Sequence, residues 1–162
     1  MESLTISPGF VALGSDCRGA LALPWTKIGQ QRGAQEVVTI DEPLVGFWLK
    51  RACEGVLNDA QLMTGGPHQF RTFFQQAITT LGLQELGFKP YSLRRGGATH
   101  DFLSHHNVQR TLMRGRWGDV RTGRIYITDG AAQIASLRIS PQVRASMQLY
   151  SSLLLEASGC NV

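Results

Sequence analysis

The chain has 162 residues, of which 43% are hydrophobic and 17% are charged. This is enough for one domain with its own core, and the composition does not suggest disorder. Sixteen Lys and Arg against twelve Asp and Glu give a net charge of +4, which suits a polyanionic partner without requiring one. Three widely spaced cysteines exclude a disulfide framework, and no apolar run reaches the roughly 18 to 20 residues of a membrane span.

The first part of the chain predicts a β-hairpin followed by a helix. Two extended segments, residues 20–26 and 36–41, flank a polar stretch with an exposed basic tip. After Asp41, an Asp-Glu-Pro start precedes apolar residues at three- and four-residue intervals as far as Val56. That spacing is typical of an amphipathic helix of about four turns.

The rest of the chain predicts helices. A Gly-Gly-Pro break at 65–67 opens one that Gly82 would stop, and Lys89-Pro90 forces an extended approach to Arg-Arg-Gly-Gly at the start of the next. The pattern then predicts helices over residues 98–105 and 108–113, separated near Asn107, and does not decide residues 122–129 and 131–137. A last helix is expected from Pro141, and its apolar side is formed by Val143, Met147, Tyr150, Leu153 and Leu154. The predicted class is mainly α with a small antiparallel β-sheet.

Four side chains could carry chemistry, although each also has an ordinary interpretation. Arg94 beside two glycines could hold a phosphate together with backbone N–H groups, or could be a solvated arginine. Trp117 could donate its indole N–H or simply anchor the core, and Tyr126 could be a nucleophile or a half-buried core tyrosine. Lys27, taken alone, could be a surface lysine.

The order and spacing of these residues change their interpretation. YSLRRGGATH from Tyr91, then GRW, then RIYI around Tyr126 resembles the catalytic core of the tyrosine recombinase (phage integrase) family. Trp117 follows Arg94 by 23 positions and Tyr126 follows Trp117 by nine, as expected for that family. PWTKIGQQRG places Lys27 where the family carries its hairpin lysine, so the resemblance covers about residues 2–137.

The resemblance implies the family's fold and a DNA phosphoryl-transfer site without a metal or other cofactor. Tyr126 would attack a DNA phosphodiester to give a 3′-phosphotyrosyl intermediate, and Arg94 would neutralise charge on the phosphate. Trp117 would donate to the phosphate, and Lys27 would protonate the leaving 5′-oxygen. Tyr91 stands where the family has a histidine. The basic residues expected to contact DNA are Arg95, Arg32, Arg116 and Arg121.

Two departures from the family bear on activity. Tyr91 replaces a group of near-neutral pKa with a phenol that is mostly a neutral donor. The family's first catalytic arginine is missing, and Glu2-Ser3-Leu4 resembles the end of the segment that carries it. We therefore expect residues 1–140 to be a catalytic domain lacking its first segment, with 141–162 as a C-terminal helix and tail, and whether the chain is an enzyme stays open.

The function predicted by the resemblance is DNA cleavage and rejoining in site-specific recombination or integration by a mobile element. The alternatives are a catalytically inactive DNA-binding remnant and a helical interaction domain whose motif match is accidental. The expected partners are double-stranded DNA and further copies of the chain, up to a tetramer at synapsis, with no membrane. The expected location is intracellular, in the nucleus of a eukaryote and otherwise in the cytoplasm. His100, His105 and His106 lack the partners of a recognisable metal site.

Overall fold

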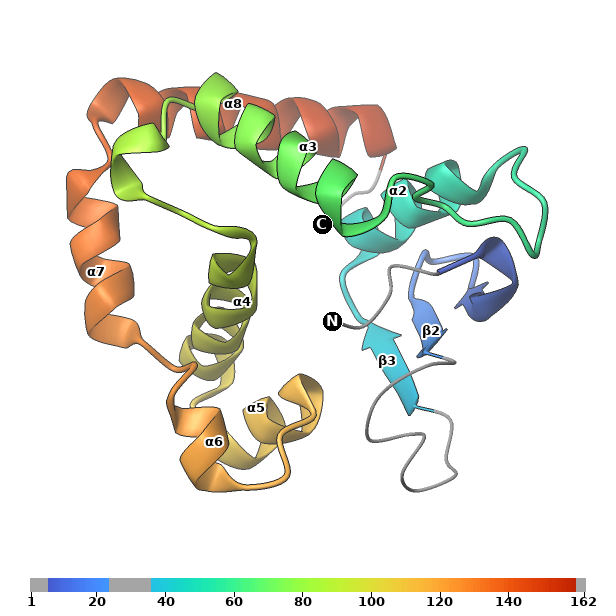
Figure 1. Cartoon of the computed structure of the whole chain (residues 1–162), viewed down its shortest axis with the longest axis horizontal. Coiled ribbons are helices and arrows are strands. Elements are labelled where there is room, and N and C mark those ends of the chain that lie inside the picture. Colours follow the sequence, from blue (N-terminus) through green and yellow to red (C-terminus); the bar gives the residue numbers. More distant parts are fainter. Residues whose placement is uncertain (1–5, 24–35, 160–162) are drawn as a thin grey trace. The chain divides into compact units, whose positions relative to one another are not determined.

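A computed structural model describes residues 6–23 and 36–159, and the described chain packs as two compact units. One lies within Met1–Phe70 and Leu149–Val162, and the other is Arg71–Gln148. The described elements are mainly helices with one three-stranded antiparallel sheet (Figure 1), which confirms the predicted α plus small β class. The predicted division into 1–140 and 141–162 stays a prediction.

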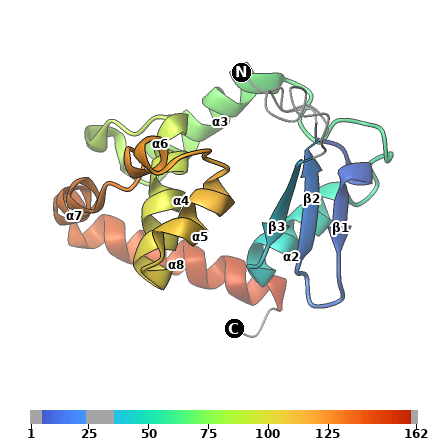
Figure 2. The same ribbon diagram turned by 90° about the horizontal axis from the view of Figure 1, so that it is seen from below.

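The first unit contains the sheet, in the order β1 (Val11–Leu13), β2 (Gly19–Leu23), β3 (Glu36–Ile40), which Figure 2 shows side by side. Both pairings are antiparallel, and Leu21 of β2 lies opposite Val38 of β3. The predicted pairing of the two hairpin strands is therefore confirmed. The sequence did not predict β1, and Lys27 and Arg32 lie outside the described residues.

Helix α2 (Pro43–Cys53) contacts β3 and requires a glycine in its first turns. The helix starts at Pro43, as predicted. Proline suits the first helical position because its fixed φ is already helical and the N–H that it lacks would have no partner within the helix there. The helix ends at Cys53, shorter than the pattern to Val56 suggested. A Cβ atom on Gly46 would lie 1.6 Å from the carbonyl oxygen of Cys17, so only glycine allows this approach.

The second unit is helical and contains α3 (Gly66–Thr80, from Arg71 on), α4 (Pro90–His105), α5 (Val108–Gly115), α6 (Val120–Arg124), α7 (Asp129–Arg138) and α8 (Pro141–Ser158, as far as Gln148), as well as a 3₁₀ turn at Gln84–Leu86. Helix α4 contacts α5 and α7, and α5 contacts α6. Ile78, Leu83, Ala98 and Leu112 are its buried apolar side chains.

Helix α4 begins earlier than predicted, and this corrects the expectation for Arg94 and Arg95. Lys89 is extended, Pro90 occupies the first helical position, and the Ser92 hydroxyl accepts the Lys89 N–H at 3.0 Å. Arg94 and Arg95 therefore lie inside the helix, so their backbone N–H groups are not the free donors of a helix start. Pro90 starts the helix, and the glycine pair that suggested a later start lies within it, where an added Cβ would meet nothing within 4 Å.

Polar caps set the ends of the later helices. Asn107 Oδ1 accepts the Arg110 N–H at 3.0 Å, which separates α4 from α5 as predicted. Asp119 Oδ1 accepts the Thr122 N–H at 2.7 Å and starts α6. The predicted start at Pro141 is confirmed for α8, but most of its apolar side is exposed; the exposed members are Met147, Tyr150, Leu153 and Leu154.

Replacement of Gly46 by Ala should destabilise the protein by about 1 to 3 kcal/mol, because the new methyl group overlaps the Cys17 carbonyl. The matched control is Gly97→Ala in α4, where an added Cβ meets nothing within 4 Å and helix propensity should add up to about 1 kcal/mol. Urea unfolding measures both. Equal stability of Gly46→Ala and the unsubstituted protein would show that the close approach is absent.

Candidate functional site

Four predicted site residues lie together in the second unit. Tyr91 and Arg94 are one turn apart on α4, Trp117 follows α5, and Tyr126 follows α6. The rings of Trp117 and Tyr126 stack, with centroids 4.6 Å apart and planes at 22°. Arg94 Cζ lies 4.9 Å from the centroid of the Trp117 ring and 5.5 Å from that of Tyr126, within cation–π range. The structure thus brings together residues up to 35 positions apart.

A buried threonine fixes the segment that carries Tyr126. The Thr99 side chain lies inside α4 and is only 3% exposed. Its hydroxyl donates to the carbonyl of Tyr126 at 3.2 Å and accepts the N–H of Thr128 at 3.0 Å. One side chain thereby ties the backbone on both sides of Ile127 to α4. Sequence reasoning missed this role, since a hydroxyl within a helix gives no sign of a distant partner.

Glycine provides the space that Trp117 occupies. A Cβ atom on Gly115 would lie 1.9 Å from the Trp117 ring, so the ring rests directly on this backbone. The Trp117 backbone N–H donates to the Leu112 carbonyl at 3.0 Å, and Arg116 takes a left-handed conformation with φ of 55° between the two residues. The Gly-Arg-Trp sequence is therefore a tight turn that lays the indole against α5.

The indole nitrogen of Trp117 is buried and makes no hydrogen bond with any group among the described residues. Among the groups that lower the pKa of Tyr126, Trp117 has the smallest influence. A buried donor without a partner costs about 1 to 3 kcal/mol and is uncommon in native proteins. The indole N–H is thus a buried donor that no described group satisfies.

The guanidinium of Arg94 is held beside the two rings by a hydrogen bond to the backbone. Its Nη2 donates to the carbonyl of Gly115 at 2.9 Å, which links α4 to the end of α5. The Arg94 residue as a whole is exposed. A guanidinium carries five N–H donors and a permanent charge, so this position can stabilise an anion next to Tyr126.

The two phenols of the cluster differ in acidity. Tyr91 Oη donates a hydrogen bond to Tyr126 Oη at 2.5 Å. This bond lowers the pKa of Tyr126, as does the nearby charge of Arg94, while desolvation opposes both. The same bond raises the pKa of Tyr91, with desolvation adding to it and the charges of Arg94 and Arg95 opposing it. Tyr126 is therefore the phenol that ionises first.

The remaining predicted residues lie in different surroundings. Arg95 and Arg121 are exposed on α4 and α6, and Arg116 is half-buried in the turn before Trp117. Lys27 and Arg32 lie outside the described residues, so their predicted roles are unchanged.

Asp101 connects α4 to α5 on another part of the unit. Its carboxylate accepts the Thr111 hydroxyl at 2.7 Å and lies 3.4 Å from Arg114 Nε and 3.8 Å from Arg110 Nε. The His105 ring nitrogen Nδ1 lies 2.9 Å from the Asp101 carbonyl oxygen. Among residues 6–23 and 36–159, no three His, Cys, Asp or Glu residues gather as metal ligands.

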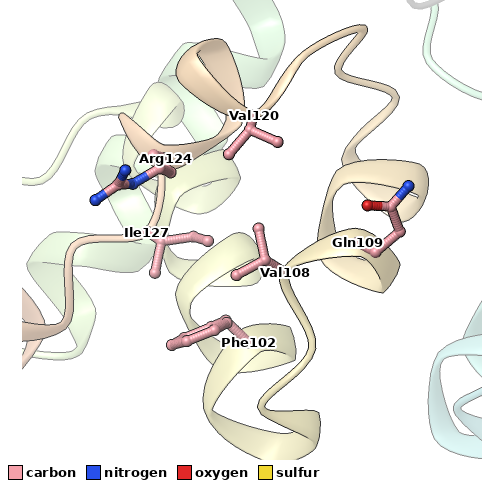
Figure 3. A pocket seen from close by; sticks show the side chains of 6 residues that line it. All are labelled: Phe102, Val108, Gln109, Val120, Arg124 and Ile127. Carbon is pink, nitrogen blue, oxygen red and sulfur yellow. The ribbon is translucent and has the colours of Figure 1, made fainter.

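A mainly apolar cavity of about 680 Å³ lies between α4, α5 and α6. Figure 3 shows its apolar side chains turned toward one another, with one amide and one guanidinium at the sides. The lining residues are Phe102, Val108, Gln109, Val120, Arg124 and Ile127. Sequence reasoning did not single out this cavity, because its lining comes from three separate elements.

No family model, curated protein or solved structure matches this chain. In the part of the chain that the structure describes, no helix has both the length and the apolar character needed to cross a membrane.

Substitution of Thr99 by Val should lower the free energy of unfolding by about 1 to 3 kcal/mol, because the Tyr126 carbonyl and the Thr128 N–H lose their shared partner. Thr99→Ser keeps the hydroxyl and is the matched control, with a smaller loss. Chemical denaturation compares the two variants. If they unfold at the same denaturant concentration, the hydroxyl does not hold this segment.

Substitution of Gly115 by Ala should displace the Trp117 ring and weaken the near-ultraviolet circular dichroism of the stacked aromatic residues. Gly118→Ala is the control, because a Cβ atom there meets nothing within 4 Å. An unchanged spectrum for a folded Gly115→Ala variant would mean that the ring does not rest on this glycine.

Proposed function

We propose that this chain is the catalytic part of a tyrosine recombinase, which cleaves and rejoins DNA through a covalent bond to Tyr126. The observation that carries the proposal is the cluster of Tyr126, Arg94 and Trp117, because a candidate nucleophile, a fixed cation and a donor without a partner meet at one point. The sequence motif supplies these residues in the order that the family has. With no matching relative, the proposal rests on the motif and this geometry together.

The proposed step is an in-line displacement at phosphorus. Tyr126 Oη forms the new bond to phosphorus while the bond to the 5′-oxygen of the next nucleotide breaks. The phenol proton leaves to solvent, and the leaving oxygen takes a proton, for which Lys27 is the proposed donor. Attack by a 5′-hydroxyl on the phosphotyrosine reverses the step and joins the strands, so the bond energy is conserved.

Arg94 and Trp117 would stabilise the charge that develops on the non-bridging oxygens. Phosphoryl transfer depends chiefly on positioning and on neutralising that charge. Arg94 already lies over the Tyr126 ring, and the Trp117 N–H gains its missing partner if it donates to a phosphate oxygen. A donor whose partner arrives only with the substrate can contribute directly to binding and catalysis.

Double-stranded DNA and further copies of the chain are the proposed partners. Arg95, Arg116 and Arg121 stand near the cluster in sequence and would contact the DNA backbone, which makes binding strongly dependent on salt. The exposed apolar residues of α8 support assembly on DNA, up to the tetramer that strand exchange requires.

The test is formation of a covalent DNA adduct. Because the target is unknown, the substrate is a pool of random-sequence duplexes, each carrying a bridging 5′-phosphorothiolate beside a nick and offered at low salt. The thiolate leaves without protonation, so the result does not depend on Lys27. We expect an adduct on the tryptic peptide 125–138, which contains Tyr126, detected by mass spectrometry.

Tyr126→Phe should abolish the adduct, whereas Tyr150→Phe, which removes an exposed phenol from α8, should keep it. An adduct that survives in Tyr126→Phe contradicts the proposed nucleophile. Salt-dependent DNA binding without any adduct identifies the inactive DNA-binding remnant instead, and no binding at low salt contradicts both.

A further inference from the structure

Tyr91 makes the most direct contact with Tyr126 in the cluster, and the backbone fixes both partners. Tyr91 is the second residue of α4, immediately after Pro90, and its hydroxyl lies 2.5 Å from that of Tyr126. Tyr126 is attached to the same helix by the Thr99 bridge. The two phenols therefore meet because one rigid helix holds both of them.

The surroundings of the two rings are unequal. Tyr126 stacks on Trp117 and lies beneath Arg94, so its ring orientation is restricted. Tyr91 is 55% exposed, and its ring is tilted at 56° to that of Tyr126 with centroids 5.8 Å apart. The packed ring accepts the hydrogen bond and the exposed ring donates it.

The direction of the bond decides which oxygen is nucleophilic. A donor keeps its proton, while an acceptor is stabilised in its ionised form. The charged groups that act on the pair are Arg94, on both phenols, and Arg95, on Tyr91. The hydrogen bond has the largest influence on the pKa of each phenol, lowering that of Tyr126 and raising that of Tyr91.

We infer that Tyr91 is a positioning residue for the nucleophile: its hydroxyl holds the Tyr126 oxygen in place and stabilises it as the phenolate that attacks phosphorus. The inference rests on the proposed function and gives a role to Tyr91, which departs from the family pattern. Tyr91 itself forms no bond to phosphorus. During the step it keeps its own proton, and the proton of Tyr126 leaves to solvent.

This role predicts a crossing of two pH profiles. Without the Tyr91 hydroxyl, the pKa of Tyr126 should rise. At a pH below the pKa, each unit by which the pKa rises lowers the fraction of Tyr126 present as phenolate tenfold. The more basic phenolate is, however, the stronger nucleophile once formed. Tyr91→Phe should therefore form the adduct more slowly at neutral pH, yet match or exceed the unsubstituted protein above both pKa values. A purely structural defect would slow the reaction at every pH.

The first measurement needs no DNA. The chain has three tyrosines, so ¹³Cζ-tyrosine labelling gives three NMR signals, which Tyr→Phe variants assign. We expect the Tyr126 signal to titrate at lower pH than the Tyr91 signal. In Tyr91→Phe, Tyr126 should move toward the ordinary value. Because the two phenols interact, the two pKa values observed for Tyr91 and Tyr126 describe the pair as a whole. Independent titration of Tyr91 and Tyr126 at one pKa overturns the inference.

The second measurement is the adduct rate on the phosphorothiolate duplexes as a function of pH, with Tyr150→Phe as the control for loss of a phenol. A profile for Tyr91→Phe that is displaced to higher pH supports the inference. A parallel loss at all pH values, or an adduct on Tyr91 itself, overturns it. Unequal titration of the two phenols without any adduct supports the hydrogen-bonded pair and overturns the proposed function, so the two failures are distinguishable.

Discussion

The candidate site depends on the buried hydroxyl of Thr99. Helix α4 carries Tyr91 and Arg94, whereas Tyr126 belongs to the segment after the short helix α6. Thr99 joins the two by accepting one backbone N–H and donating to one backbone carbonyl. This attachment holds the segment that carries Tyr126 against the helix that carries Tyr91. The hydrogen bond from Arg94 to Gly115 completes the frame from the side of α5.

The sequence predicted the elements that have strong local signals. Proline at the first helical position located α2 and α8, and the capping residue Asn107 separated α4 from α5. The strand β1 has only three residues and α6 only five, too few for a periodic pattern. The start of α4 was misplaced because two glycines within a helix imitate a boundary, although nothing crowds the space around them.

Four of the predicted site residues lie together in the structure, but the contacts between them could not be derived from the sequence. The resemblance of the motifs to a known family grouped Arg94, Trp117 and Tyr126, and these three side chains do meet. Periodicity and composition do not report how side chains pack. They could therefore not predict the hydrogen bond from Tyr91 to Tyr126 or the missing partner of the Trp117 N–H. The structure also changes the meaning of Tyr91, which in the sequence was only a departure from a family pattern.

We propose that this cluster receives a DNA phosphate. The indole N–H of Trp117 tests it most directly, because it is buried beside Tyr126 and lacks a partner. The chain has three tryptophans, so a ¹H–¹⁵N spectrum resolves three indole signals, with Trp48 on α2 as an internal control. On titration with duplex DNA, we predict a downfield shift of the Trp117 indole proton that is lost in Arg94→Ala. A Trp117 signal that stays unchanged at saturating DNA would show that no phosphate binds at this cluster.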